Sequence, residues 1–419
     1  MRLNPKIFKI LNRNKKIIEN FSYLSILQVL NMLIPLIVFP YLIRVLGSNT
    51  YGLVIYAQAI IGYFVVLINF GFNITATKEI SIHKYNREKL NKIISSVFII
   101  KGFFFVISIL ILTALIFVIP ELRDNKLLFY LTLWLCVYEL IFPIYYFQGV
   151  EEMKYITIIT LISRCIFLVL TFLLVNQSGD YLLVPIINGT GALIAGVISQ
   201  YIIFKKGIKY SWQPLRILKL YIKKSYIMAL AYASNTLKTN LNIVIVKFLF
   251  SYKEVAYFDL ALKISRIGMS FLELISISIF PKMSRDKNKF FLRKIIYLCI
   301  GLSVGFVIIV QFFAPLLVLI LGGEQMTDSI FILTVVVFFV PFEILSGLFG
   351  RNCLIIHGYD KDVLYSMALS SVAYVLIIII VYFSLGNQIS LFLLSLIFVF
   401  SFMVDAVYRY IMCRKYNIL

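Results

Sequence analysis

The sequence predicts an all-α polytopic membrane protein with twelve transmembrane helices, in two six-helix bundles related by a parallel pseudo-twofold repeat around a central cavity. Two observations predict this fold class. Of the 419 residues, 61% are hydrophobic and 14% are charged, against roughly 45 to 50% and 25% in soluble domains. Apolar runs of about 20 residues, the length that crosses a bilayer as a helix, recur along the chain. A soluble enzyme is therefore excluded.

Each predicted span is an apolar run that ends where charged residues, glycine or proline interrupt it. A helix rises 1.5 Å per residue, so about 20 residues cross a hydrocarbon core of about 30 Å. No segment alternates apolar and polar residues at the period of a strand, which excludes a transmembrane barrel. The twelve spans are residues 22–45, 51–76, 95–119, 127–148, 154–176, 181–204, 226–250, 255–281, 294–321, 328–350, 363–384 and 388–411.

The first span follows a basic arm, as the apolar part of a signal peptide would. It is longer than about 20 residues, contains Pro35 and Pro40, and has no small-residue cleavage site. We therefore predict that it is a transmembrane helix of the folded protein.

The basic residues indicate the topology. The chain has 40 Lys and Arg against 19 Asp and Glu, a net charge of +21. Most of these cations lie in the N-terminal arm, in the even-numbered connections and after the last span, whereas the opposite connections hold Arg44, Arg123, Lys126 and Lys253. Because basic segments stay on the cytoplasmic side, both termini are predicted to be cytoplasmic. Because membrane topology accounts for the basic excess, we do not expect a nucleic-acid partner.

The longest break in the pattern divides the chain into two halves. Residues 1–204 are predicted to form the N-terminal six-helix bundle, 205–225 a cytoplasmic interfacial linker, and 226–419 the C-terminal six-helix bundle. The linker interleaves basic residues with apolar ones, which predicts an amphipathic helix at the membrane interface. Its apolar residues are Trp212, Leu215, Leu218, Leu220 and Ile222.

The sequence contains no site for a cofactor or a metal. No G-x-x-x-x-G-K-[ST] motif occurs, so ATP hydrolysis by this chain is excluded. The five cysteines are single and have no metal or redox spacing, and we interpret them as small apolar residues of the core. His83 and His357 lie far apart in connections and form no ligand cluster.

A weak internal repeat relates the two halves. A shift of 204 residues aligns Gly52 with Ala256 and Lys78 with Lys282, so that the second and eighth spans begin and end together. A shift of 209 residues aligns the segments that begin at Gln148 and His357. The matches keep one order and one side of the membrane. They predict a parallel repeat with an axis along the membrane normal and a substrate cavity near the midplane.

Three segments resemble the polysaccharide-biosynthesis flippases, and most of all their O-antigen (Wzx-type) group. They are R-V-L-G-S-N-T-Y-G at Arg44 to Gly52, Y-F-Q-G-V-E-E-M-K-Y at Tyr146 to Tyr155, and E-V-A-Y-F-D-L-A-L-K-I at Glu254 to Ile264. Span order and loop lengths extend the resemblance over nearly the whole chain. One departure is Ala256, where these flippases often have glycine.

The resemblance implies the fold of the multidrug/oligosaccharidyl-lipid/polysaccharide exporter superfamily in a bacterial inner membrane. It implies transfer of undecaprenyl-diphosphate-linked oligosaccharide, an O-antigen or capsule repeat unit, from the cytoplasmic to the outer leaflet. The expected partners are this lipid-linked oligosaccharide, the lipid bilayer, and a polysaccharide polymerase with its chain-length regulator.

Charged residues inside the spans are the sharpest functional signal, because each costs about 2.5 to 3.5 kcal/mol at mid-bilayer unless it is compensated. The seventh and eighth spans carry polar residues three or four apart, which places each set on one face of a helix. The seventh has Asn235, Lys238 and Asn242; the eighth has Asp259, Lys263, Arg266, Ser270 and Glu273.

Lys238 and Arg266 are predicted to lie at the same depth, roughly 17 to 18 Å from the turn between their spans. A diphosphate bound between them would relieve their repulsion, because Arg forks onto phosphate oxygens and Lys supplies a point charge. The alternative is internal pairing of Asp259 with Lys263 and of Glu273 with Arg266. The predicted substrate-binding residues are Lys238, Lys263, Arg266, Arg164, Asn235 and Asn242.

Other charged and polar residues inside the spans have structural interpretations, and some of them also have functional ones. Arg164 and Glu139 share a depth on neighbouring spans, so Arg164 either pairs with Glu139 or contacts phosphate or sugar. Asp405 and Arg409 are an i, i+4 pair that we interpret as structural. Asn69 and Asn73 either bind sugar hydroxyls or form interhelical hydrogen bonds.

An intramembrane carboxylate can also carry a proton or sodium ion and so couple transport to an ion gradient. The candidates are Glu343, Glu273 and Asp259. The sequence does not choose between them.

Two other functions compete with this one. A multidrug exporter of the same fold would favour an acidic cavity for cationic drugs, and Lys238, Lys263 and Arg266 argue against it. A membrane polymerase or glycosyltransferase needs catalytic groups at the outer surface, where the predicted connections are short and hold no paired carboxylates. We therefore predict a transporter with no catalytic residues.

Overall fold

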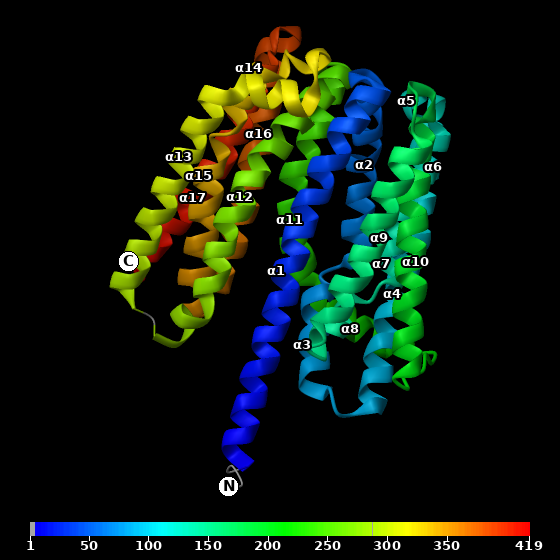
Figure 1. Ribbon diagram of the computed structural model, residues 1–419, viewed down its shortest axis with the longest axis vertical. Coiled ribbons are helices and arrows are strands. Elements are labelled where there is room, and N and C mark those ends of the chain that lie inside the picture. The colour runs from blue at the N-terminus through cyan, green and yellow to red at the C-terminus, as the bar shows by residue number, and fades with distance from the viewer. Residues whose placement is uncertain (1–4, 287) are drawn as a thin grey trace. The chain divides into compact units, whose positions relative to one another are not determined.

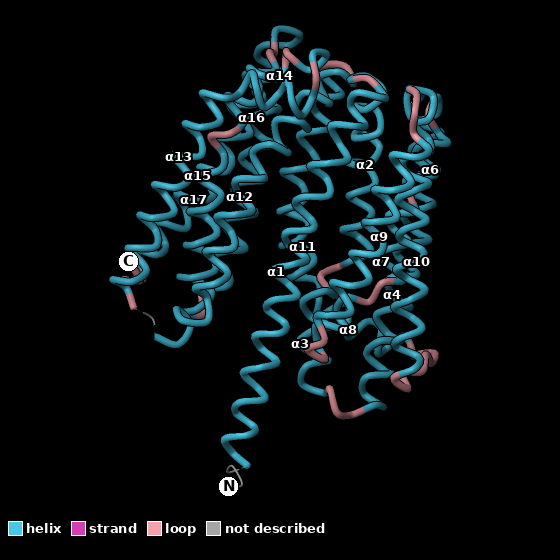
Figure 2. The backbone as a smooth tube through the Cα atoms, viewed as in Figure 1, coloured by secondary structure: helices cyan, strands magenta, loops and turns pink. Residues whose placement is uncertain are grey.

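The computed structural model describes residues 5–286 and 288–419, and it contains helices and no strand in those residues (Figures 1 and 2). Ten helices of the described chain are long and apolar enough to cross a membrane, which makes the chain a multi-pass membrane protein. Inside the helices, the side chains of residues 5–18, 21, 24, 231, 235, 237–239, 277, 278, 280–282, 284, 286 and 387 lie outside the description.

The ten membrane-crossing helices coincide with ten of the twelve predicted spans. The remaining two predictions, 226–250 and 255–281, fall in α11 (Leu215–Leu249) and α12 (Tyr252–Asp286). These two helices are long enough to cross a bilayer at 1.5 Å per residue, but they carry most of the predicted site charges. The count of twelve and the twofold repeat stay predictions.

The chain forms two compact units. Unit 1 contains residues 1–38 and 61–232, and unit 2 contains residues 39–60 and 233–419. Helices α1 (Pro5–Leu46), α2 (Ser48–Asn69) and α11 contribute residues to both units. The two six-helix bundles and the linker inferred from the sequence stay a prediction.

Unit 1 is built around α10 (Leu183–Lys205), which packs against α7 (Trp134–Ile141) and α9 (Met153–Leu174). Small residues allow the close approach, because a Cβ at Gly191 would lie 2.9 Å from the Ser163 hydroxyl and one at Gly196 would lie 2.0 Å from Ile141. Such small-residue faces are typical of helix packing in membranes. The other elements are α3 (Phe72–His83), α4 (Arg87–Val118), α5 (Pro120–Asp124), α6 (Lys126–Thr132), α8 (Ile144–Gly149) and η1 (Ser178–Leu182).

Two predicted spans of unit 1 contain a break. In the span predicted at 51–76, Phe70 and Gly71 have φ angles of 44° and 74°, so α2 ends and α3 begins. In the span predicted at 127–148, the chain is extended at Phe142 before Pro143, which separates α7 from α8. Proline has no N–H to donate and disfavours helical geometry in the residue before it.

The predicted linker, residues 205–225, is helical mainly in its second half. Residues 206–214 are not helical, and the backbone N–H groups of Lys209 and Ser211 donate to Asn91 and Ser95 at the start of α4, each at 3.0 Å. Burial raises the pKa of Tyr210 to about 12, so it remains a hydroxyl. The helix that follows Pro214 begins at Leu215 and continues as α11. Leu215, Leu218, Leu220 and Ile222 of the predicted amphipathic helix therefore lie in the first turns of α11, whereas Trp212 precedes it. The interfacial position of the linker stays a prediction.

Unit 2 is centred on α17 (Leu391–Lys415), which packs against α14 (Ser329–Val336), α15 (Phe339–Gly347) and α16 (Asp360–Leu385). Phe398 and Phe402 of α17 contact Phe339 of α15 in an edge-to-face and a tilted arrangement, with ring centroids 5.5 and 5.1 Å apart. Aromatic contacts of this kind add to the burial of the rings. The unit also contains α13 (Lys289–Gly322), η2 (Glu324–Met326), the π-helical η3 (Leu348–Leu354), η4 (Ile355–His357) and η5 (Gly386–Gln388).

Candidate functional site

The polar face of α12 lies in an uninterrupted helix. Asp259, Lys263, Arg266, Ser270 and Glu273 are spaced three or four residues apart and therefore share one side of α12. The opposite side is apolar and buried. The structure thus keeps the stripe together, but its charges have different surroundings.

Lys263 is neutralised by its neighbours. Its ammonium lies 2.6 Å from Asp259 Oδ2 and donates to the hydroxyl of Tyr51. The Tyr51 hydroxyl in turn donates to Asp259 at 2.7 Å, and the rings of Phe39 and Tyr51 flank the ammonium at 5.0 and 5.1 Å. The predicted alternative of an Asp259–Lys263 pair is confirmed. Tyr51 is a partner that the sequence analysis missed.

Arg266 is exposed in the middle of the same helix, roughly 21 Å from its first residue at 1.5 Å per residue. Its guanidinium makes no hydrogen bond or ion pair with any residue that the structure describes. Asp259 and Glu343 lie close enough to influence it electrostatically. Arg266 is therefore accessible and incompletely neutralised in this conformation.

Glu273 pairs with Arg351 at 3.1 Å, so the expected pairing of Glu273 with Arg266 is wrong. Arg351 belongs to the π-helical η3, and the next residue, Asn352, donates to Ser276 of α12 at 2.8 Å. π-Helical turns often occur at functional sites.

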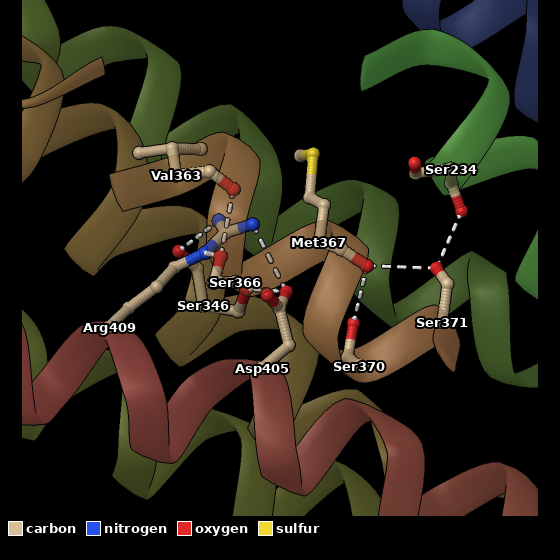
Figure 3. A network of polar contacts seen from close by, with 9 residues as sticks. All are labelled: Ser234, Ser346, Val363, Ser366, Met367, Ser370, Ser371, Asp405 and Arg409. Atoms are coloured by element: carbon tan, nitrogen blue, oxygen red, sulfur yellow. Dashed lines mark hydrogen bonds and ion pairs between the residues drawn. The ribbon is translucent and has the colours of Figure 1, made fainter. Parts of the chain in front are cut away.

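Asp405 and Arg409 form a buried ion pair at 3.1 Å, as expected for a structural pair (Figure 3). Arg409 donates from Nε to Ser366 at 2.8 Å and from Nη1 to the Ser346 carbonyl at 2.9 Å. Ser346 donates to Asp405 Oδ2 at 2.5 Å. The network joins α15, α16 and α17. Asp405 Oδ1 is buried and has no hydrogen-bond partner among the described groups.

The residues around this network enclose a cavity of about 240 Å³ in unit 2. Glu273 and Glu343 line it together with Asp405, Arg351 and Arg409. Two of the three predicted ion-coupling residues therefore meet at one cavity, whereas the third, Asp259, is engaged by Lys263 and Tyr51. In the part of the chain that is described, no three His, Cys, Asp or Glu side chains are grouped to hold a metal ion.

Unit 1 contains a buried cluster that the sequence analysis missed. Lys101 is fully buried and donates to the side chain of Glu139 at 2.7 Å and to its carbonyl at 2.9 Å. Asn69 donates to Glu139 at 2.9 Å and accepts from Gly71 N–H at 3.1 Å. The partner of Glu139 is therefore Lys101, and the Arg164–Glu139 pair was wrong. Asn69 takes the interhelical role that was one of its two interpretations.

The other predicted substrate-binding residues have varied surroundings. Arg164 is half-buried on α9, within electrostatic reach of Tyr138, and forms no ion pair with a described residue. Asn242 is buried and accepts from the Tyr374 hydroxyl at 2.8 Å. The side chains of Lys238 and Asn235 lie outside the described residues. The assignment of all six residues to substrate binding therefore stays a prediction.

Comparison with known proteins places the chain in a family. The family model described as "Polysaccharide biosynthesis protein" matches residues 17–287. A "Putative O-antigen transporter" of Escherichia coli (strain K12) is 28% identical over 362 residues, 84% of this chain and 87% of the relative. A protein of Shigella dysenteriae with the same description is 25% identical over 406 residues, 93% of this chain and 99% of the relative.

Solved structures show the fold. The lipid II flippase MurJ, in an inward closed conformation, is 15% identical with a TM-score of 0.73, over 95% of this chain and 87% of that one. An inward-facing multidrug resistance MATE family transporter of the MOP superfamily is 14% identical with a TM-score of 0.71, over 95% and 98% of the two chains. The chain shares its fold with these two transporters, and it belongs to the polysaccharide biosynthesis protein family.

Proposed function

We propose that this protein is a flippase that moves an undecaprenyl-diphosphate-linked oligosaccharide, an O-antigen or capsule repeat unit, from the cytoplasmic to the outer leaflet by alternating access. Three findings support the proposal: the family, the description of the two relatives as O-antigen transporters, and the superfamily fold. The protein belongs in a bacterial inner membrane with both termini cytoplasmic.

The main structural support for the proposal is the exposed guanidinium of Arg266. A guanidinium at mid-bilayer costs about 2.5 to 3.5 kcal/mol unless something compensates it, and Arg266 is exposed without an ion pair among the described residues. A diphosphate compensates it in the bound state, because guanidinium binds phosphate oxygens in a bidentate manner. Lys238 on α11 is its proposed partner. Lys263 adds positive charge nearby, although its ammonium already contacts Asp259 and Tyr51.

Arg164 has a separate role in this proposal. It lies in unit 1 without an ion pair to a described residue, so we assign it a contact with phosphate or sugar on that unit. Asn235 and Asn242 are proposed to contact the glycan. For Asn242 this requires a conformation in which its hydrogen bond to Tyr374 opens.

Ion coupling is proposed at the cavity of unit 2, where Glu273 and Glu343 lie with Asp405. Gain of a proton or sodium ion there changes the charge balance with Arg351 and Arg409, and so changes which conformation is favoured. Asp259 is the weaker candidate because Lys263 and Tyr51 already stabilise its charged form.

The chemistry of α12 disfavours a multidrug exporter of cationic drugs, although the fold is shared with a MATE transporter. Arg266 would repel a cationic drug and attract a diphosphate. The charge of the transported molecule therefore distinguishes the two functions.

The test is complementation in a bacterial strain that lacks its own flippase, with surface glycan as the readout at matched protein levels. Arg266→Ala is expected to lower surface glycan about tenfold or more, because a charged hydrogen bond contributes about 1.5 to 3 kcal/mol. Arg266→Lys should retain part of the activity. Lys238→Ala and Arg164→Ala should each reduce it.

The matched control is Lys361→Ala, which removes an exposed cation in the first turn of α16. It should leave the surface glycan unchanged. Full activity of Arg266→Ala, Lys238→Ala and Arg164→Ala would refute the diphosphate site.

A further inference from the structure

A groove lies between α13 and α17 of unit 2. Helix α15 packs against both of these helices (Figure 1), and the groove between them has a volume of about 510 Å³. Its walls include Tyr297 of α13 and Tyr410 of α17, which are 73% and 42% exposed. The groove is therefore open to the surroundings of unit 2 and separate from the polar cavity of the same unit.

One end of the groove is basic. Arg293 lies in the second turn of α13 and Arg414 in the last turn of α17, and both line the groove with exposed side chains. The two helices run in opposite directions here, since Lys289 at the start of α13 donates to the Asn417 carbonyl beyond α17. Within the described chain neither guanidinium pairs with a carboxylate, and Arg414 lies 5.9 Å from the Tyr410 ring.

The groove becomes apolar with depth. Ile300 and Val407 lie seven residues from Arg293 and Arg414, about 10 Å along the helices. Phe342 lines the same stretch. Farther along the seam between α13 and α15, a second cavity of about 480 Å³ is lined by apolar residues and Gln311 and by no described cation. Positive charge is thus confined to one end.

This arrangement matches the shape and polarity of a lipid. Helix α13 is a membrane-crossing helix with large exposed apolar side chains, so the groove faces hydrocarbon. Tyrosine side chains favour the boundary between hydrocarbon and headgroups, and basic pockets between helices on the cytoplasmic side bind lipid phosphates. Two unpaired guanidinium groups favour a headgroup with net negative charge over one that also carries an ammonium group.

We propose that this groove binds an anionic phospholipid of the cytoplasmic leaflet. Arg293 and Arg414 hold the headgroup phosphate, and an acyl chain lies along Ile300 and Val407. The site is distinct from the proposed diphosphate site on α12, and it stands whether or not the flippase proposal holds. It makes the lipid composition of the membrane a factor in the stability of unit 2.

Native mass spectrometry of the full-length protein in detergent tests the site, with dioleoyl phosphatidylglycerol and dioleoyl phosphatidylcholine as probes. The wild type should retain phosphatidylglycerol preferentially. The double variant Arg293→Ala/Arg414→Ala should bind it roughly 30-fold more weakly, because each cation near a membrane surface contributes about fivefold. Lys294→Ala/Lys415→Ala is the matched control, since it removes two exposed cations from the adjacent positions that do not line the groove.

A second variant tests the apolar part. Val407→Trp fills the groove without changing its charge, and it should also displace phosphatidylglycerol. Inorganic phosphate, which has no acyl chain, should not compete at equal concentration.

Three results would overturn the assignment. They are equal binding by the Arg293→Ala/Arg414→Ala protein and the lysine control, equal retention of both phospholipids by the wild type, and displacement of phosphatidylglycerol by a lower concentration of undecaprenyl phosphate. Thermal unfolding of each variant shows whether it is folded before its lipid binding is compared.

Discussion

At the scale of single residues, most of the described charges that the sequence places inside the membrane have an opposite charge beside them in the same unit. Lys101 is held by Glu139, Lys263 by Asp259 and Arg409 by Asp405, at 2.7, 2.6 and 3.1 Å. The two i, i+4 pairs could be predicted from the sequence, because a helix brings such residues together. The partner of Glu139 could not, since spacing gives the depth of a residue and not the neighbouring helix that it faces.

The buried pair of unit 1 gives a prediction on stability. Lys101→Met leaves Glu139 buried without its cation, which should destabilise the fold by about 3 to 5 kcal/mol. The double variant Lys101→Met/Glu139→Gln leaves no uncompensated charge and should recover much of this loss. Thermal unfolding of the detergent-purified proteins measures both. Equal stability of the single and the double variant would contradict the role of the pair.

At the scale of elements, the described helices are more irregular than the apolar pattern indicates. Pro143 signals one break in the sequence, whereas the break at Phe70 and Gly71 depends on backbone angles that the sequence signals weakly. The π-helical η3, from which Arg351 and Asn352 contact α12, was not foreseen. Such contacts leave no periodic trace in the sequence.

The end of α15 and the η3 segment that follows it provide a matched pair of glycine variants. A Cβ at Gly350 would lie 2.5 Å from Arg409 Nη1, whereas a Cβ at Gly347 would meet nothing within 4 Å. Gly350→Ala should therefore displace Arg409 and destabilise unit 2 by about 1 to 3 kcal/mol. Gly347→Ala should be neutral or slightly stabilising, because alanine is the better helix former. Thermal unfolding distinguishes them, and an equal effect of both changes would contradict the packing of Arg409.

At the scale of the whole molecule, the fold class and the family follow from the order of apolar spans and three short segments. Ten of the twelve predicted spans coincide with membrane-crossing helices, and the family model covers residues 17–287. The candidate site was less predictable. Asp259, Lys263, Arg266 and Glu273 were placed on one face, but their separate partners follow from contacts with Tyr51 and Arg351, which lie far away in the sequence.

The distribution of basic residues predicts where reporters will be active. A cytoplasmic reporter fused after residue 419 should be functional, and one fused after residue 178, in the connection before the predicted sixth span, should not. The opposite pattern is expected for a reporter that folds only outside the cytoplasm. If both fusions report the same side, the predicted topology fails.

The two helix breaks of unit 1, at Phe70 and at Phe142, are linked to each other. Helices α3 and α8 both lie beyond a break, and they pack against each other, while Asn69 and Lys101 tie the break points together through Glu139. The two short helices are not free to move on their own, because Phe72 of α3 and Tyr145 of α8 lie in one buried core with residues of α4, α9 and α10. Removing the hydrogen bonds at the break points would therefore loosen this core as a whole.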